Sequence, residues 1–420
     1  MGSATRARGP ERAVSRQPSL TRAFGPVRLQ QLVLVEVAAA VVCVCWIISP
    51  LLLAPAGVVA LALIALALPR RRQQQMADWL AAAGALRRRQ KHAKGPLAPG
   101  TDPSLAPVVE CDPALRTYSY ATRDRRQVGM VGDGTFLTAV VQVQGTDVPL
   151  RPMGAGRALP LGLLHDALRV DDIRLESVQV VQHTQPAPAP HLPPQSVAAR
   201  SYAPLQEQSG APAVRMTWVA LKLHPELCAE AVEARGGGLE GAQRCLLRAV
   251  DQLASRLTGA GFAAKPLEEG ELTAAIATSA CVNPLATAQA GRGNAAARRT
   301  VESSRAWRCD DRWHTSYWVS RWPQLGPGVT PLSQIVALLT GTPALATTFA
   351  LTLSPGQGPA GRADARISGY LRLTGRSDTE LVDGRKAMER AARSMKVALV
   401  RLDREQVPGV LATLPLGGTR

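Results

Sequence analysis

The chain has 420 residues, of which 46% are hydrophobic and 19% charged, so it can build a sizeable core and is not dominated by disorder. Its net charge is +17, from 49 Lys and Arg against 32 Asp and Glu. Glycine and proline follow no period, which excludes a collagen-like fibre, and seven cysteines are too few for a disulfide scaffold.

The excess positive charge is concentrated near the amino end. Residues 1–94 hold 14 Lys and Arg against three acidic residues. A nucleic-acid-binding protein usually carries its basic stripe on a folded domain, so we predict no nucleic-acid partner. Here the charge flanks an apolar stretch, which is typical of a membrane topology signal.

Residues 32–68 are almost continuously apolar. As a single helix these 37 residues would extend roughly 55 Å, whereas a hydrocarbon core is about 30 Å thick. Pro50 and Pro55 near the middle disfavour one continuous helix. We therefore predict two transmembrane helices, at about 29–48 and 52–69. A cleaved signal peptide and a hairpin that dips into the membrane without crossing it are the alternatives.

Basic residues flank this stretch on both sides, which predicts a membrane protein with two spans and with both termini and the main domain in the cytoplasm. Residues 70–94 are rich in Ala and Leu and favour a basic juxtamembrane helix. Six arginines there are expected to contact anionic lipid headgroups, namely Arg70, Arg71, Arg72, Arg87, Arg88 and Arg89.

Strand and helix patterns alternate in the rest of the chain. Residues 128–145 contain two β-rich runs around Asp133-Gly134, which is typical of a two-residue hairpin turn. From 135 to 265 the predicted order is β-α-β-β-α-β, and the same order returns from 313 to 402. This is the order of a ferredoxin-like unit, so we predict an α/β (α+β) region made of two such halves.

Composition sets the expected boundaries, because Pro-rich and small-residue stretches indicate linkers. The predicted organisation is a basic disordered tail at 1–28, two transmembrane helices at 29–69, a juxtamembrane helix at 70–94, a linker at 95–126, a first half at 127–282 with a Pro-rich loop at 185–213, a linker at 283–304 and a second half at 305–420.

No motif points to catalysis, so we predict that the chain is not an enzyme. It has no Walker A, G-x-S-x-G, H-E-x-x-H or C-x-x-C pattern. The best catalytic candidate is Cys309-Asp310-Asp311 with His314, but on one strand Cys309 and His314 would face opposite ways. His183 and His191 lack a third metal ligand in register. We predict neither a metal nor a cofactor.

Aromatic residues concentrate between 305 and 323. On one strand Trp318 and Trp322 would share a face, and Trp313 and Tyr317 the other. Bulky side chains on both faces fit a strand buried between layers, or a surface on which a partner docks. The candidate interface residues are Trp307, Trp313, Tyr317, Trp318 and Trp322.

The chain resembles EccE, the membrane core component of actinobacterial type VII (ESX) secretion systems, in four segments that occur in the same order: RRRQQQMADWLAAAGALRRR, VGMVGDGTFLTAVVQV, ESSRAWRCDDRWHTSYWVSRWP and RLDREQVPGVLATLPLGG. The resemblance implies a non-catalytic structural component of a plasma-membrane complex with EccB, the ATPase EccC and EccD, which anchors and docks the translocation machinery. A membrane-tethered regulatory or binding module outside such a complex, or a membrane-anchored enzyme, is the alternative.

Overall fold

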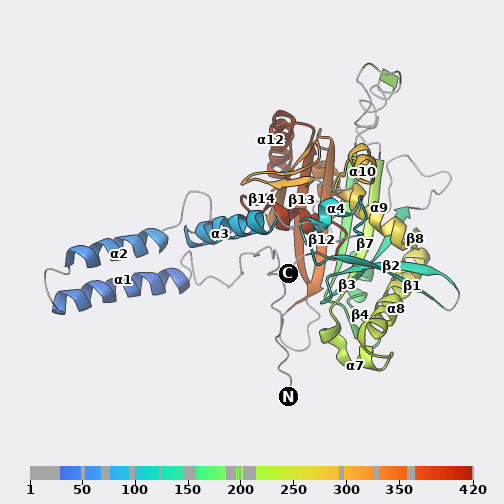
Figure 1. The fold of residues 1–420 in the computed structure, drawn as a ribbon, viewed down its shortest axis with the longest axis horizontal. Helices are drawn as coiled ribbons and strands as arrows, with labels where there is room; N and C mark the ends of the chain where they lie inside the picture. The colour runs from blue at the N-terminus through green and yellow to red at the C-terminus, as the bar shows by residue number, and fades with distance from the viewer. Residues whose placement is uncertain are drawn as a thin grey trace. The chain divides into compact units, whose positions relative to one another are not determined.

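The computed structural model describes residues 29–48, 53–67, 76–93, 100–122, 125–145, 158–185, 214–292, 298–324, 331–356 and 365–418, with isolated positions at 195, 197, 200 and 201. These residues belong to two compact units, one within Arg16–Lys94 and one within Gly95–Thr419 (Figure 1). The predicted tail at 1–28 and most of the Pro-rich loop at 185–213 lie outside the described residues.

The described residues of the smaller unit form three helices, α1 (Leu29–Ile48), α2 (Leu53–Ala67) and α3 (Met76–His92). α1 packs along α2, and α2 contacts α3. Both apolar helices form where they were predicted, and the basic helix starts six residues later than expected. The two-span prediction, however, is not supported. Within the described ranges, no helix combines the length and the apolar character that crossing a membrane requires. α2 has 15 residues and is therefore only about 22 Å long.

The larger unit is built on one sheet, which has 12 strands in the described part of the chain. Their bounds in chain order are β1 (Arg116–Ala121), β2 (Gln127–Gly132), β3 (Leu137–Gly145), β6 (Ser177–Gln185), β7 (Val214–Leu223), β8 (Phe262–Pro266), β9 (Thr300–Glu302), β10 (Trp307–Cys309), β11 (Arg312–Arg321), β12 (Ala346–Pro355), β13 (Ala365–Gly375) and β14 (Ala398–Arg401). A separate two-stranded ribbon comprises β4 (Arg169–Val170) and β5 (Ile173–Arg174).

Both predicted β-α-β-β-α-β units are present, and they share one strand order. In the first half the order is β8-β3-β7-β6, with α5 (Leu161–Asp166) after β3 and α8 (Gly238–Gly259) after β7. In the second half it is β14-β11-β13-β12, with α11 (Leu332–Thr340) and α12 (Asp378–Ser394) in the equivalent places. All of these neighbours are antiparallel, as in a split β-α-β unit. β6 pairs with β12, and this pairing joins the halves into one sheet.

The two segments predicted as linkers contribute to the fold. Residues 95–126 contain α4 (Ala106–Val109) and β1, and Val108 and Val109 are buried. Residues 283–304 contain α10 (Pro284–Ala290) and β9. In each half a short hairpin extends the first strand, because β1-β2 continues onto β3 and β9-β10 onto β11. Proline and small residues therefore do not mark linkers here, since β1 and β9 each pair with the next strand in a hairpin and α4 is buried.

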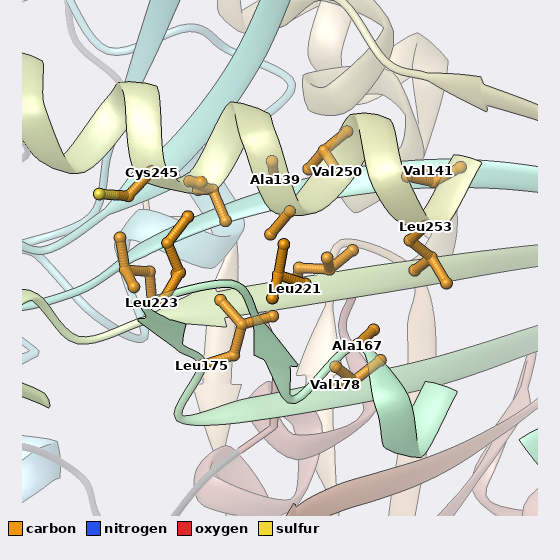
Figure 2. Close-up of a cluster of buried hydrophobic side chains, with 14 of the residues drawn as sticks. Ala139, Val141, Ala167, Leu175, Val178, Leu221, Leu223, Cys245, Val250 and Leu253 are labelled. Atoms are coloured by element: carbon orange, nitrogen blue, oxygen red, sulfur yellow. The ribbon is translucent and has the colours of Figure 1, made fainter. Parts of the chain in front are cut away.

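The sheet is covered on both faces. On one face α8 packs on β3, β7 and β8, where Leu246, Val250 and Leu253 meet alternate residues of the strands. Figure 2 shows this cluster, with Cys245, Val250 and Leu253 of α8 facing Ala139, Val141 and Leu221. The preceding elements η2 (Pro225–Cys228) and α7 (Ala229–Glu233) complete this side. In the second half α11 and α12 pack on β11, β12 and β13 in the same way.

The opposite face carries the last helix of each half, α9 (Glu269–Ser279) and α13 (Gln406–Thr413). Ile276 of α9 and Val410 of α13 are fully buried against the alternate strand residues. Val140, Val181, Ala220, Ala350 and Tyr370 belong to this second core. The sheet is thus the middle of three layers, which leaves its central residues without access to water.

Candidate functional site

The aromatic cluster divides into buried and half-buried members. Trp307 and Tyr317 are buried, and the Tyr317 hydroxyl donates to Oε1 of Glu389 at 3.1 Å. Burial raises the pKa of Tyr317. Trp313, Trp318 and Trp322 are half-buried. Of the five candidate interface residues, only these three therefore have side-chain surface that a partner could reach in this conformation.

The expected pairing of faces is wrong for Trp318 and Trp322. Trp318 packs against the core beneath α9 and α13, whereas Trp322 packs on the α11 and α12 side. The register of β11 against β14 shifts between Val319 and Arg321. Such a bulge inserts one extra residue and reverses the alternation of side chains beyond it.

Trp313 lies next to a cation. It is the cross-strand partner of Arg308, and the guanidinium carbon of Arg308 lies 6.0 Å from the centroid of the Trp313 ring. Arg308 is exposed. An arginine on a tryptophan face forms a cation–π contact, and these residue types often dominate binding energy at interfaces.

The segment around Cys309 is a hairpin and not one strand. β10 ends at Cys309, β11 begins at Arg312, and Asp310 in the turn has φ 53°. Burial raises the pKa of the Cys309 thiol, with a further contribution from Asp310, so thiolate formation is disfavoured. This environment gives no support to a cysteine nucleophile.

Asp310 instead belongs to a buried ion pair. Arg299 donates to both carboxylate oxygens of Asp310 at 2.8 Å, and both side chains are buried. Arg299 also donates to the carbonyl of Pro103 at 2.6 Å, and its own main-chain N–H donates to Glu110 at 2.9 Å. These contacts tie the segment before α4 and the end of α4 to the β10–β11 turn, so the acidic residues here are structural.

The described residues include three of the six arginines that were predicted to contact lipid. Arg70, Arg71 and Arg72 lie outside the described residues. On α3, Arg87 and Arg88 are exposed and Arg89 is half-buried. His191 also lies outside the described residues, and no group of three or more His, Cys, Asp or Glu side chains among the described residues could hold a metal ion.

A row of buried polar side chains crosses the middle of the sheet, and sequence reasoning missed it. His183 on β6 pairs with Thr348 on β12, Thr348 pairs with Arg372 on β13, and Arg372 pairs with Ser316 on β11. All four residues are fully buried on the face covered by α9 and α13. The one available signal was Arg372 itself, a charged residue among the apolar residues of a strand-like run.

Hydrogen bonds fix the direction of the protons in this row. Gln185 Nε2 donates to Nε2 of His183 at 3.0 Å, so the neutral imidazole carries its proton on Nδ1 and donates to the hydroxyl of Thr348, 2.8 Å away. Arg372 Nη2 donates to the same hydroxyl at 3.3 Å. Burial, aided by the charge of Arg372, lowers the pKa of His183 to about 3. The same causes hold the pKa of His314 well below its usual range. Both imidazoles are therefore neutral near pH 7.

The ends of α9 and α13 meet above this row. Ser279, the last residue of α9, donates from Oγ to the carbonyl of Thr413, the last residue of α13, at 3.3 Å. The Ser279 carbonyl accepts a hydrogen bond from Arg372 Nη2. A helix carboxyl end carries roughly half a negative charge, so α9 compensates part of the arginine charge.

The chain beyond α13 then crosses onto the first half. Gln179 on β6 donates to the carbonyl of Ala412 at 2.8 Å and accepts from the Gly417 N–H at 2.9 Å. Gly417 has φ 86°, and a Cβ there would lie 2.5 Å from Cβ of Lys222. Glycine is thus required at this position, both for its backbone conformation and for the close approach.

The match to a known protein family lies in the middle of the chain. Residues 211–319 match the EccE family, described as "Putative type VII ESX secretion system translocon, EccE". The match confirms the resemblance to EccE. It covers about a quarter of the chain, from β7 to most of β11. It includes Ser279, Arg308 and Trp313, whereas Arg372 lies outside it. No curated protein matches the chain.

Proposed function

We propose that this chain is a non-catalytic component of a type VII secretion complex, and that its larger unit is a rigid body on which other components dock. The observation that carries the proposal is the match of residues 211–319 to EccE. The fold supports a docking role, because a sheet covered on both faces holds surface residues in fixed relative positions.

Rigidity has two independent sources in the larger unit. The halves share the β6–β12 ladder, with pairs from Thr347↔Thr184 to Leu353↔Val178. They are also joined above the sheet by the hydrogen bond between the ends of α9 and α13. Relative movement of the halves would have to break both connections, so we propose that the unit moves as one body.

The partner contact that we propose is the Arg308–Trp313 pair. Its guanidinium is exposed and its ring half-buried, and both residues lie in the segment that matches EccE. Trp318 and Trp322 are separate candidate contacts, because they pack on opposite faces of the sheet. The proposed partners are EccB, EccC and EccD-like components.

We further propose that the smaller unit associates with the plasma membrane. α1 exposes Trp46 and Ile47, which are 70% and 86% accessible, and α2 exposes Val58 and Leu61 to a similar degree. Apolar helix faces of this kind favour lipid, and Arg87 and Arg88 on α3 would favour anionic headgroups.

Co-purification tests the secretion role. We would place an affinity tag at the amino end, because the residues up to Gly418 at the other end are buried, and identify what is recovered from native membranes in mild detergent. A large assembly that contains a P-loop ATPase and a many-span protein would support the proposal. Recovery alone or as a small oligomer would contradict it and favour a binding module outside a secretion complex.

The same assay tests the docking pair. Arg308→Ala with Trp313→Leu should release the partners, while the Lys386→Ala variant, which changes an exposed cation on α12, should keep them. Retention of all partners by the double variant would exclude this pair as the contact.

For the membrane role, flotation with anionic and neutral vesicles should show binding that weakens in Arg87→Gln/Arg88→Gln.

A further inference from the structure

Four buried polar atoms of Arg372 and two neighbouring residues have no hydrogen-bond partner among the described residues. These atoms are Nε and Nη1 of Arg372, Oγ of Ser316 and Nε2 of His314. Ser316 lies directly across from Arg372 in the β11–β13 ladder, and His314 lies two residues along the same face of β11. The atoms therefore belong to one place in the fold.

Each of these atoms can donate a hydrogen. The Cys281 thiol lies 3.7 Å from Oγ1 of Thr374 and donates to it, so the Thr374 hydroxyl can donate to Nδ1 of His314 at 3.0 Å. His314 then carries its proton on Nε2. The two arginine nitrogens are donors only, and a serine hydroxyl turns to suit an acceptor. The site therefore contains several hydrogen-bond donors and lacks an acceptor for them.

The place also carries net positive charge. A guanidinium is protonated at every physiological pH. Among the described residues, the titratable side chains that influence Arg372 are the thiols of Cys281, Cys309 and Cys111, and no carboxylate is among them. Burial raises the pKa of all three thiols, so they are neutral. The Ser279 carbonyl compensates only part of the charge.

We propose that this centre binds one small inorganic anion of the halide class, which accepts hydrogen bonds from Arg372, Ser316 and His314. The anion would supply the missing negative charge and an acceptor for one edge of the guanidinium, for Ser316 and for His314, whereas a water molecule would supply no charge. It must be small, because Gly409 of α13 lies over Ser316 so closely that a Cβ there would be 2.5 Å from Cβ of Ser316.

Bromide is the direct probe, because it replaces chloride and scatters anomalously. Crystals of the full chain grown in sodium bromide should show an anomalous peak within hydrogen-bonding distance of the Arg372 guanidinium. Bromide peaks confined to the protein surface, or ordered water beside Arg372, would overturn the proposal.

A solution measurement keeps the test independent of crystals. At constant ionic strength, replacing gluconate by chloride should raise the Tm of the full chain, since a ligand that binds only the folded state stabilises it. The rise should be lost in Ser316→Ala, which should fold because only one hydroxyl without a partner is removed. The control, Arg376→Gln, changes an exposed arginine and should retain the full rise. No chloride effect, or an equal effect in Ser316→Ala, would overturn the inference.

Discussion

Ser279 and Thr413, which end α9 and α13, are joined by a hydrogen bond of 3.3 Å across the boundary between the two halves. Each helix is the last helix of its half, and the two meet end to end on one face of the sheet. The halves are therefore connected through two layers, the strands and the helices above them. This connection supports the proposal that the larger unit moves as one body, and it lies over the polar row.

The close approach of α13 to β11 predicts a large effect of one methyl group. In Gly409→Ala the new Cβ would lie 2.5 Å from Cβ of Ser316 and 2.7 Å from Cδ1 of Leu402, so α13 must shift. We expect the free energy of unfolding in urea to fall by about 1 to 3 kcal/mol. The control Gly270→Ala adds a methyl group to α9 in open space and should change stability by less than about 1 kcal/mol. Equal effects would contradict this packing.

Gln179 should be important for stability although it is far from any surface. Gln179→Met removes the bonds to the Ala412 carbonyl and the Gly417 N–H and leaves both groups buried without a partner. A loss of about 2 to 4 kcal/mol in urea denaturation is expected. The exposed Gln144→Met on β3 should change stability by less than about 0.5 kcal/mol. Similar stabilities of the two variants would show that the carboxyl-terminal segment is not held in this way.

The two buried imidazoles predict acid sensitivity. Because the folded pKa values of His183 and His314 lie below the unfolded value near 6.5, their contribution is complete above pH 6.5 and is lost as the pH falls below it. Between pH 7 and 5.5 the free energy of unfolding should drop by about 2 kcal/mol. His314→Gln should remove about half of this dependence. If the free energy of unfolding did not change between pH 7 and 5.5, water would have to reach the two imidazoles in the folded protein.

The Arg299–Asp310 pair predicts a penalty for an uncompensated charge. Arg299→Met leaves the Asp310 carboxylate buried without its cation, which should cost about 3 to 5 kcal/mol. Adding Asp310→Asn should restore part of the loss, because the remaining group is neutral. In the exposed Arg256–Asp166 pair, Arg256→Met should cost less than about 1 kcal/mol. Urea denaturation of the three variants and the parent protein checks the order of these losses.

The burial of three cysteine thiols predicts that they are alkylated slowly in the folded chain. Burial raises the pKa values of Cys111, Cys281 and Cys309, so iodoacetamide at pH 8 should leave all three unmodified in the folded chain and alkylate them in urea. Peptide mass analysis gives the extent at each site. Rapid modification of Cys309 in the folded protein would reopen the possibility of a nucleophile.

Much of the larger unit was predictable because its elements are encoded locally. Apolar residues at helical spacing, followed by glycines, predict α8. The β-branched and aromatic residues within β7 predict that strand. The order of elements then indicated two β-α-β-β-α-β halves. The turn at Asp310 was not predicted, because neither neighbour is glycine and the strand pattern continues through it.

The sequence by itself determined the two halves, the apolar helices with their basic neighbour, and the resemblance to EccE, because each rests on residues close together in the chain. Tertiary structure alone decided which aromatic residues are buried, that the predicted linkers form strands and helices, and that the ends of α9 and α13 meet. It also brought His183, Thr348, Arg372 and Ser316 into one row. The physical reason is strand register, which places His183 and Thr348 side by side although they are 165 positions apart, and which no local pattern encodes.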